Sequence, residues 1–148
     1  MDENKLWDLR VFVYRHFAET TRPPDVDESA RRFALTHEET ASAYEALHQR
    51  HAFFLNPGTH DILMANPFSG VETLFKVHAK DKTYFANCAW DSLGIPAALH
   101  VDAQIDAACA QSGERLHLTL SRQTVQNDAG LVHFLVPFRD WYNDLPFT

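Results

Sequence analysis

The sequence has few of the features that mark secreted, membrane-spanning or zinc-stabilised proteins. Its two cysteines, Cys88 and Cys109, are too few for a structural zinc site built from thiolates alone. No apolar run approaches the ~18 residues that cross a bilayer. The polar, acidic start of the chain lacks the basic and apolar regions of a signal peptide. We therefore expect a cytoplasmic protein with reduced thiols and no membrane partner.

Positive charge is also scarce, with 13 Lys and Arg against 20 Asp and Glu and a net charge of −7. A protein that binds the phosphate backbone of a nucleic acid needs a basic surface, so we expect no nucleic-acid partner. The sequence also lacks a His-Glu-x-x-His zinc motif, a glycine-rich phosphate loop and a nucleophile elbow around a serine. Its 148 residues suffice for one ordinary domain or two small lobes that share a core.

The first third of the chain has the apolar periodicity of helices. Residues 6–20 repeat apolar side chains at three- and four-residue steps, and a short helix is predicted over 25–33. A capping box, Thr36 to Glu39, begins a third helix. Two apolar runs at 51–55 and 61–64 then predict a hairpin. Residues 1–65 are thus expected to form a winged-helix-like lobe, although the acidic third helix argues against DNA binding.

The rest of the chain predicts strands around one short helix. The helix begins near Cys88 and is expected to stop at Pro96, and a final helical turn is expected over 138–143. The run 131–136 is nearly all apolar and is therefore predicted as a central strand. The other strands are predicted at 73–77, 82–85, 103–108 and 116–121. The fold class is α+β, with a small, mainly antiparallel sheet domain over 66–148 that packs with the helical lobe as one unit.

The most informative stretch is Asn87 to Pro96. Asn87 is a favoured N-cap, and a cysteine in the following turn feels the positive end of the helix dipole, which favours thiolate. Residues three apart share a helix face, so Asp91 can lie beside the sulfur of Cys88. The pair would join a nucleophile or soft metal ligand to a proton carrier. A small buried cysteine near a surface aspartate is the alternative interpretation.

A family resemblance rests on several motifs in order. They are the helical lobe, Asn66-Pro67-Phe68-Ser69, the run from Tyr84 to Asp91, and Val132-His133-Phe134. Together they resemble the alkylmercury lyase (organomercurial lyase) family over most of the chain, from about Leu6 to Trp141. The run Cys88-Ala89-Trp90-Asp91-Ser92-Leu93, with a proline shortly after it, is the most specific part.

The resemblance implies protonolysis of a carbon–mercury bond. In that chemistry two thiolates hold the soft mercury ion, and an aspartate gives a proton to the departing carbon. Cys88 matches the first thiolate and Asp91 the proton-handling acid, whereas Cys109 matches a third, more structural cysteine. The substrate would be a small organometal compound, no cofactor would be required, and Hg(II) would be a product or ligand.

The sequence departs from the family at its second catalytic cysteine. The corresponding stretch, Asn127 to Leu131, contains no cysteine around Ala129, so the resemblance implies a divergent member of the family. Cys109 or a small external thiol is a candidate for the second soft ligand. His133 is a further candidate ligand, acid or base, while Phe68 and Trp90 are candidate walls of a substrate pocket. Other aromatic side chains near the motifs are further candidates for its walls: Phe85, Phe134 and Trp141.

Three functions remain open from the sequence. The first is a lyase, or a related organometal-processing enzyme, that uses Cys88 and Asp91. The second is another cysteine-dependent enzyme that acts on a small organic substrate. The third is a binding protein for a soft metal or a small apolar ligand. The sequence decides neither whether the chain is an enzyme nor its oligomeric state.

Overall fold

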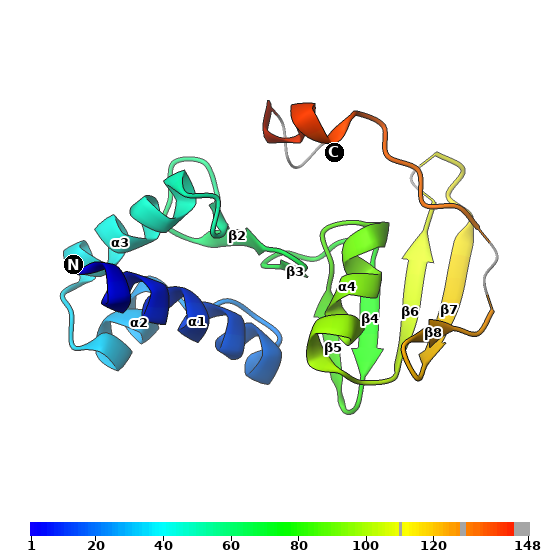
Figure 1. Cartoon of the computed structure of the whole chain (residues 1–148), viewed down its shortest axis with the longest axis horizontal. Coiled ribbons are helices and arrows are strands. Elements are labelled where there is room, and N and C mark those ends of the chain that lie inside the picture. The colour runs from blue at the N-terminus through cyan, green and yellow to red at the C-terminus, as the bar shows by residue number, and fades with distance from the viewer. Residues whose placement is uncertain (110, 128–129, 144–148) are drawn as a thin grey trace.

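The structure is a computed structural model that describes residues 1–109, 111–127 and 130–143. A helical lobe lies at one end of the molecule and a five-stranded sheet at the other, with a small sheet between them (Figure 1). The helical lobe contains α1 (Glu3–Thr20), α2 (Val26–Phe33) and α3 (His37–Gln49). The α+β prediction is confirmed.

The first helices form where the sequence supplies caps and apolar faces. The side chain of Asp2 accepts a hydrogen bond from the backbone of Lys5 and caps α1, and the predicted capping box of Thr36 and Glu39 opens α3. The predicted apolar face of α1 is buried at Leu6, Leu9, Val13 and Phe17. Apolar burial therefore holds α1 against the other helices.

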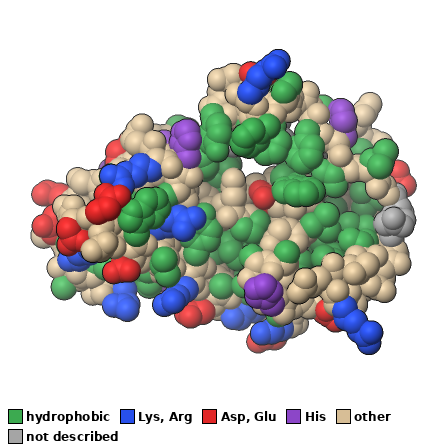
Figure 2. Space-filling model, in the orientation of Figure 1, with side chains coloured by type: hydrophobic (Ala, Val, Ile, Leu, Met, Phe, Trp, Pro, Cys, Tyr) green, Lys and Arg blue, Asp and Glu red, His purple; other side chains and the backbone are tan. Residues whose placement is uncertain are grey.

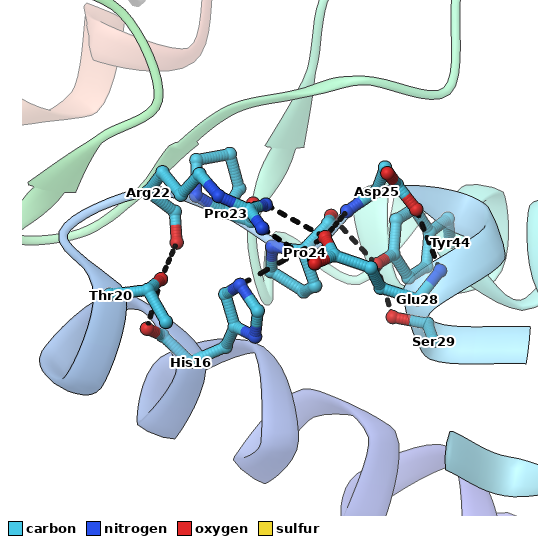
Figure 3. A network of polar contacts seen from close by, with 9 residues as sticks. All are labelled: His16, Thr20, Arg22, Pro23, Pro24, Asp25, Glu28, Ser29 and Tyr44. Atoms are coloured by element: carbon cyan, nitrogen blue, oxygen red, sulfur yellow. Dashed lines mark hydrogen bonds and ion pairs between the residues drawn. The ribbon is translucent and has the colours of Figure 1, made fainter. Parts of the chain in front are cut away.

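A polar network fixes the turn between α1 and α2. The guanidinium of Arg22 donates two hydrogen bonds to the carboxylate of Glu28, which also accepts from the backbone N–H of Asp25 (Figure 3). Deeper in the lobe, the hydroxyl of Tyr44 lies 2.7 Å from that of Ser29 and donates to the carbonyl of Pro24. The hydrogen bonds of Glu28 lower its pKa to about 2.

All strand pairs are antiparallel. The small sheet has the order β1 (Phe54–Leu55), β2 (Ile62–Ala65), β3 (Phe68–Ser69). The larger sheet has the order β5–β4–β6–β7–β8. Its strands are β4 (Lys76–Ala79), β5 (Lys82–Phe85), β6 (Ala103–Ala108), β7 (Arg115–Ser121) and β8 (Thr124–Val125). Both predicted hairpins and the predicted strands at β6 and β7 are confirmed, with shifted ends in the hairpins.

A single bridge joins the two sheets. Phe68 of β3 pairs with Ala86, the residue that follows β5. The ring of Phe68 stacks on that of Phe17 from α1 at 5.4 Å between centroids. The hydroxyl of Tyr84 donates to the carbonyl of Ala18 in the same helix. The helical lobe and the larger sheet thus share one core, while the domain boundary near residue 65 stays a prediction.

Two sequence predictions about the second half are wrong. Residues 131–136 form no strand, and Leu131 is 98% exposed, because β8 already occupies the edge of β7. The segment instead crosses over the molecule and ends in the predicted helical turn, η1 (Phe138–Asn143) (Figure 1). Helix α4 (Ala89–Leu99) also continues past Pro96, although proline lacks the backbone N–H that an interior helical residue donates.

None of the helices in the described part of the chain is long and apolar enough to cross a membrane.

Gly70 offers a direct test of the packing beside the site. A Cβ at this position would lie 2.1 Å from the carbonyl oxygen of Ile62, whereas a Cβ at Gly130 would meet nothing within 4 Å. We expect Gly70→Ala to lower the free energy of unfolding by at least about 2 kcal/mol because backbone must move. Urea denaturation measures the loss, with Gly130→Ala as the matched control. Equal stability of the two variants would contradict this packing.

Glu28 should make stability depend on acid pH. Its pKa is about 2 in the folded protein, against an ordinary value of 4.5, so its stabilising effect is present above pH 4.5 and is lost as the pH falls toward 2. Glu28→Gln should therefore cost about 1 kcal/mol at pH 7 and almost nothing near pH 2. Denaturation at several pH values measures the difference, with the exposed Glu72→Gln as control. A pH-independent difference would show that the carboxylate charge is unimportant.

Candidate active site

A cavity of about 210 Å³ lies between the small sheet and the start of α4. One wall comes from β2, β3 and the loop that follows them, and the opposite wall from the first residues of α4. The C-terminal segment closes a third side. The lining residues are Leu63, Met64, Asn66, Ser69, Val71, Thr73, Asn87, Cys88, Trp90, Asp91, Phe134 and Trp141. The cavity thus combines one thiol and one carboxyl group with mainly apolar surroundings.

Cys88 and Asp91 meet at the N-terminus of α4. Cys88 itself is the N-cap, so the expectation that Asn87 caps the helix is wrong by one residue. Its sulfur accepts the backbone N–H of Asp91 at 3.5 Å, as a serine oxygen would at this position. A cysteine can replace the usual cap residue because its sulfur also accepts a hydrogen bond, although a weak one. The thiol is therefore held at the helix end and directed along the same turn as Asp91.

Burial controls the protonation of both groups. It raises the pKa of the Cys88 thiol, and the negative charge of Asp91 raises it further, against the lowering effect of the Asp91 N–H. The expected lowering by the helix dipole is therefore outweighed. Burial also raises the pKa of Asp91, against hydrogen bonds that lower it. Ionisation of either group is therefore less favourable than in water, and a negative charge on Asp91 opposes ionisation of the thiol.

Asn87 connects Asp91 to the opposite wall. Its side-chain nitrogen lies 3.0 Å from Oδ2 of Asp91, 3.1 Å from Oδ1 of Asn66 and 3.3 Å from the carbonyl oxygen of Phe68. Asn66 and Phe68 lie in the turn and strand of the small sheet. This one amide thus ties the start of α4 to the small sheet.

Aromatic side chains form the outer wall. Trp90 meets Phe134 edge to face at 6.3 Å, and Phe134 lies 5.2 Å from Trp141, each distance measured between ring centroids. Farther along, Tyr142 stacks on His51 of the helical lobe at 4.3 Å. Hydrophobic side chains gather on this face over α4 and the C-terminal segment (Figure 2). The segment therefore bridges the two ends of the molecule across the cavity.

The structure separates the remaining sequence candidates from the cavity. Cys109 lies in the tight turn between β6 and β7 and does not line the cavity. His133 is exposed, and the ring of Phe68 is buried in the core against Phe17. Ala129 lies outside the described residues. Among the residues that are described, no group of three or more His, Cys, Asp or Glu side chains is arranged to hold a metal ion.

Sequence reasoning missed the roles of Asn87 and Asn66 at the cavity. Both belong to motifs that carry the family resemblance, which is the only signal that singles them out. Met64 is both buried and part of the cavity lining. The contact between the two walls joins segments about 20 residues apart, so periodicity cannot reveal it.

Comparison with known proteins gives two similarities. A family model described as alkylmercury lyase matches residues 68–146, just over half of the chain. A solved structure described as the mercury-bound form of MerB2 matches with a TM-score of 0.65 and 20% sequence identity. That match covers 86% of this chain but 60% of the other, so this chain spans less than two thirds of its length. At this identity the structural likeness concerns the fold. No curated protein matches the sequence.

The two cysteines should react at different pH values. The hydroxyl and backbone N–H of Ser112 lower the pKa of Cys109, whereas burial raises that of Cys88. Because the thiolate is the nucleophile, we expect iodoacetamide at pH 7.5 to label Cys109 about tenfold faster or more. Asp91→Asn should accelerate labelling of Cys88, since it removes a nearby negative charge. Mass spectrometry of peptides measures both rates.

The control for this comparison is Asp81→Asn, which removes an exposed acid from the turn between β4 and β5. It should leave both rates unchanged. Faster labelling of Cys88 than of Cys109 in the unmodified protein would contradict the effect of burial.

Proposed function

This chain belongs to the alkylmercury lyase family, and we propose that it cleaves the carbon–mercury bond of small organomercurials with Cys88 as thiolate ligand and Asp91 as proton donor. The observation that carries the proposal is that both residues line one cavity, with the Cys88 sulfur 3.5 Å from the backbone nitrogen of Asp91. The mainly apolar lining suits the hydrocarbon group of such a substrate.

The first step is capture of mercury by Cys88. Mercury is soft and prefers thiolate, so the sulfur displaces the weaker ligand that accompanies the organomercury cation. The thiol proton passes to Asp91, whose raised pKa favours the neutral acid beside it. This step leaves a sulfur–mercury–carbon unit next to a protonated carboxyl group.

The second soft ligand comes from a thiol in solution. Cys109 does not line the cavity, and the sequence has no cysteine between 127 and 131. Coordination of an external thiolate to mercury increases electron density at the carbon, which makes the carbon basic. Because the protein lacks a second thiolate at the cavity, the reaction rate depends on the concentration of the external thiol.

The third step is proton transfer from Asp91 to carbon. The carbon–mercury bond breaks, the hydrocarbon leaves with the proton, and mercury remains bound to two sulfurs. A second external thiolate then displaces Cys88, which takes back a proton from solvent. General acid catalysis of this type contributes about 10²–10⁴-fold to the rate. Asp91 suits the role because burial raises the pKa of its carboxyl group, which favours the protonated form.

Release of benzene from phenylmercury tests the proposal. With excess thiol, the protein should produce many equivalents of benzene, measured by headspace gas chromatography. Cys88→Ala should reduce the rate to that of thiol alone, and Asp91→Asn should reduce it about 100-fold while mercury still binds. Cys109→Ala is the matched control and should remain within about twofold of the original rate.

Benzene production no faster than in the Cys88→Ala variant would reject the lyase proposal. Stoichiometric capture of phenylmercury by Cys88 without benzene would favour a soft-metal binding protein instead. Loss of activity in Cys109→Ala but not in Cys88→Ala would mean that the wrong thiol has been assigned.

A further inference from the structure

We propose that Asn87 is a positioning residue of this site, whose side-chain amide holds Asp91 against the turn between β2 and β3 while the carboxyl group exchanges its proton. The inference rests on the proposed function for its catalytic meaning, but the contact itself can be tested without substrate. Asn87 lines the cavity, and the role proposed for it is exercised through Asp91.

The geometry around Asn87 fixes the direction of its amide. The carbonyl of Phe68 can only accept a hydrogen bond, and it lies 3.3 Å from Nδ2 of Asn87. The carboxylate of Asp91, 3.0 Å away, also accepts when it is ionised. Both neighbours therefore require that the NH₂ group, and not the amide oxygen, faces them.

Asn87 has two amide protons for three acceptors, namely Asp91, Asn66 and Phe68. One amide proton can be shared by the two acceptors of the small sheet, Asn66 and Phe68. The second proton is then available for Oδ2 of Asp91. The other carboxyl oxygen is left for the proton that passes between the thiol and the substrate carbon.

A neutral amide is well suited to this task. It stabilises the carboxylate by a hydrogen bond and so partly offsets the cost of burial, without adding a charge that would fix Asp91 as an anion. An arginine or lysine at this position would hold the carboxylate more strongly and prevent it from carrying a proton. Asn87 thus keeps Asp91 oriented and able to change its protonation state.

The contact with Asp91 can be measured by NMR of the Asn87 side-chain amide. Its two proton resonances are assigned by their loss in Asn87→Ala. Asp91→Asn should shift one of them upfield, because a neutral acceptor replaces a charged one. Asp81→Asn, which changes an exposed acid in the turn between β4 and β5, should leave them in place. Amide resonances that do not respond to Asp91→Asn would overturn the inference.

A double-mutant cycle on benzene release tests whether Asn87 acts through Asp91. Asn87→Ala should lower kcat about tenfold and leave KM within about threefold, because mercury capture by Cys88 is retained. The double variant Asn87→Ala/Asp91→Asn should be no slower than Asp91→Asn alone. Losses that simply multiply would overturn the inference, since a general structural defect would act independently of Asp91.

Asn87→Asp, which has the same shape, covers the case in which Asn87→Ala does not fold. It replaces the donor by a second carboxyl group, so it should also lower kcat. Raising the pH should lower kcat further, because the two carboxylates then repel each other. Activity equal to that of the unmodified protein would overturn the inference. If the unmodified protein releases no benzene, the lyase proposal fails, while the NMR result still decides whether Asn87 holds Asp91.

Discussion

The pairing of Phe68 with Ala86 is the contact on which the position of the site depends. It joins the small sheet to the larger one immediately before Asn87 and Cys88, so the start of α4 leaves the sheet beside β3. Stacking of Phe68 on Phe17 then fixes the same strand to the helical lobe. Because one main wall of the cavity belongs to the small sheet and the other to the start of α4, which directly follows the larger sheet's β5, this joint sets the distance between them.

Burial is the main physical influence on the chemistry of the cavity. It raises the pKa of both Cys88 and Asp91, so each group resists the charge that its role requires. Cys109 shows the contrast, because its hydrogen bonds lower its pKa where little desolvation opposes them. A thiol activated mainly by a helix end would be a thiolate at rest. In the proposed reaction, the half-buried thiol beside the half-buried acid is instead activated when a soft cation replaces its proton.

Much of the fold follows from local sequence patterns, whereas much of the site does not. Helix α1 and strand β7 are predictable because the spacing of their apolar residues places these residues on one face of the helix or strand. The spacing of Cys88 and Asp91 likewise follows from one helical turn. The apolar run 131–136 led to a wrong strand prediction. An apolar run indicates that side chains will pack against other apolar groups, but it does not identify those groups. The contacts of Asn87 with Asn66 and Phe68 are equally invisible, because they depend on how two sheets meet.

The same apolar run explains why the cavity has an aromatic wall. With β8 on the edge of β7, residues 131–136 lie outside the sheet, where Leu131 and Leu135 are exposed while the ring of Phe134 makes apolar contacts elsewhere. Phe134 finds them at Trp90 and Trp141, and Tyr142 finds them at His51. A wall that is held by ring contacts, without a backbone ladder, can move apart at lower cost than a strand can leave a sheet. Residues 131–136 therefore give the cavity one wall that has no backbone ladder behind it.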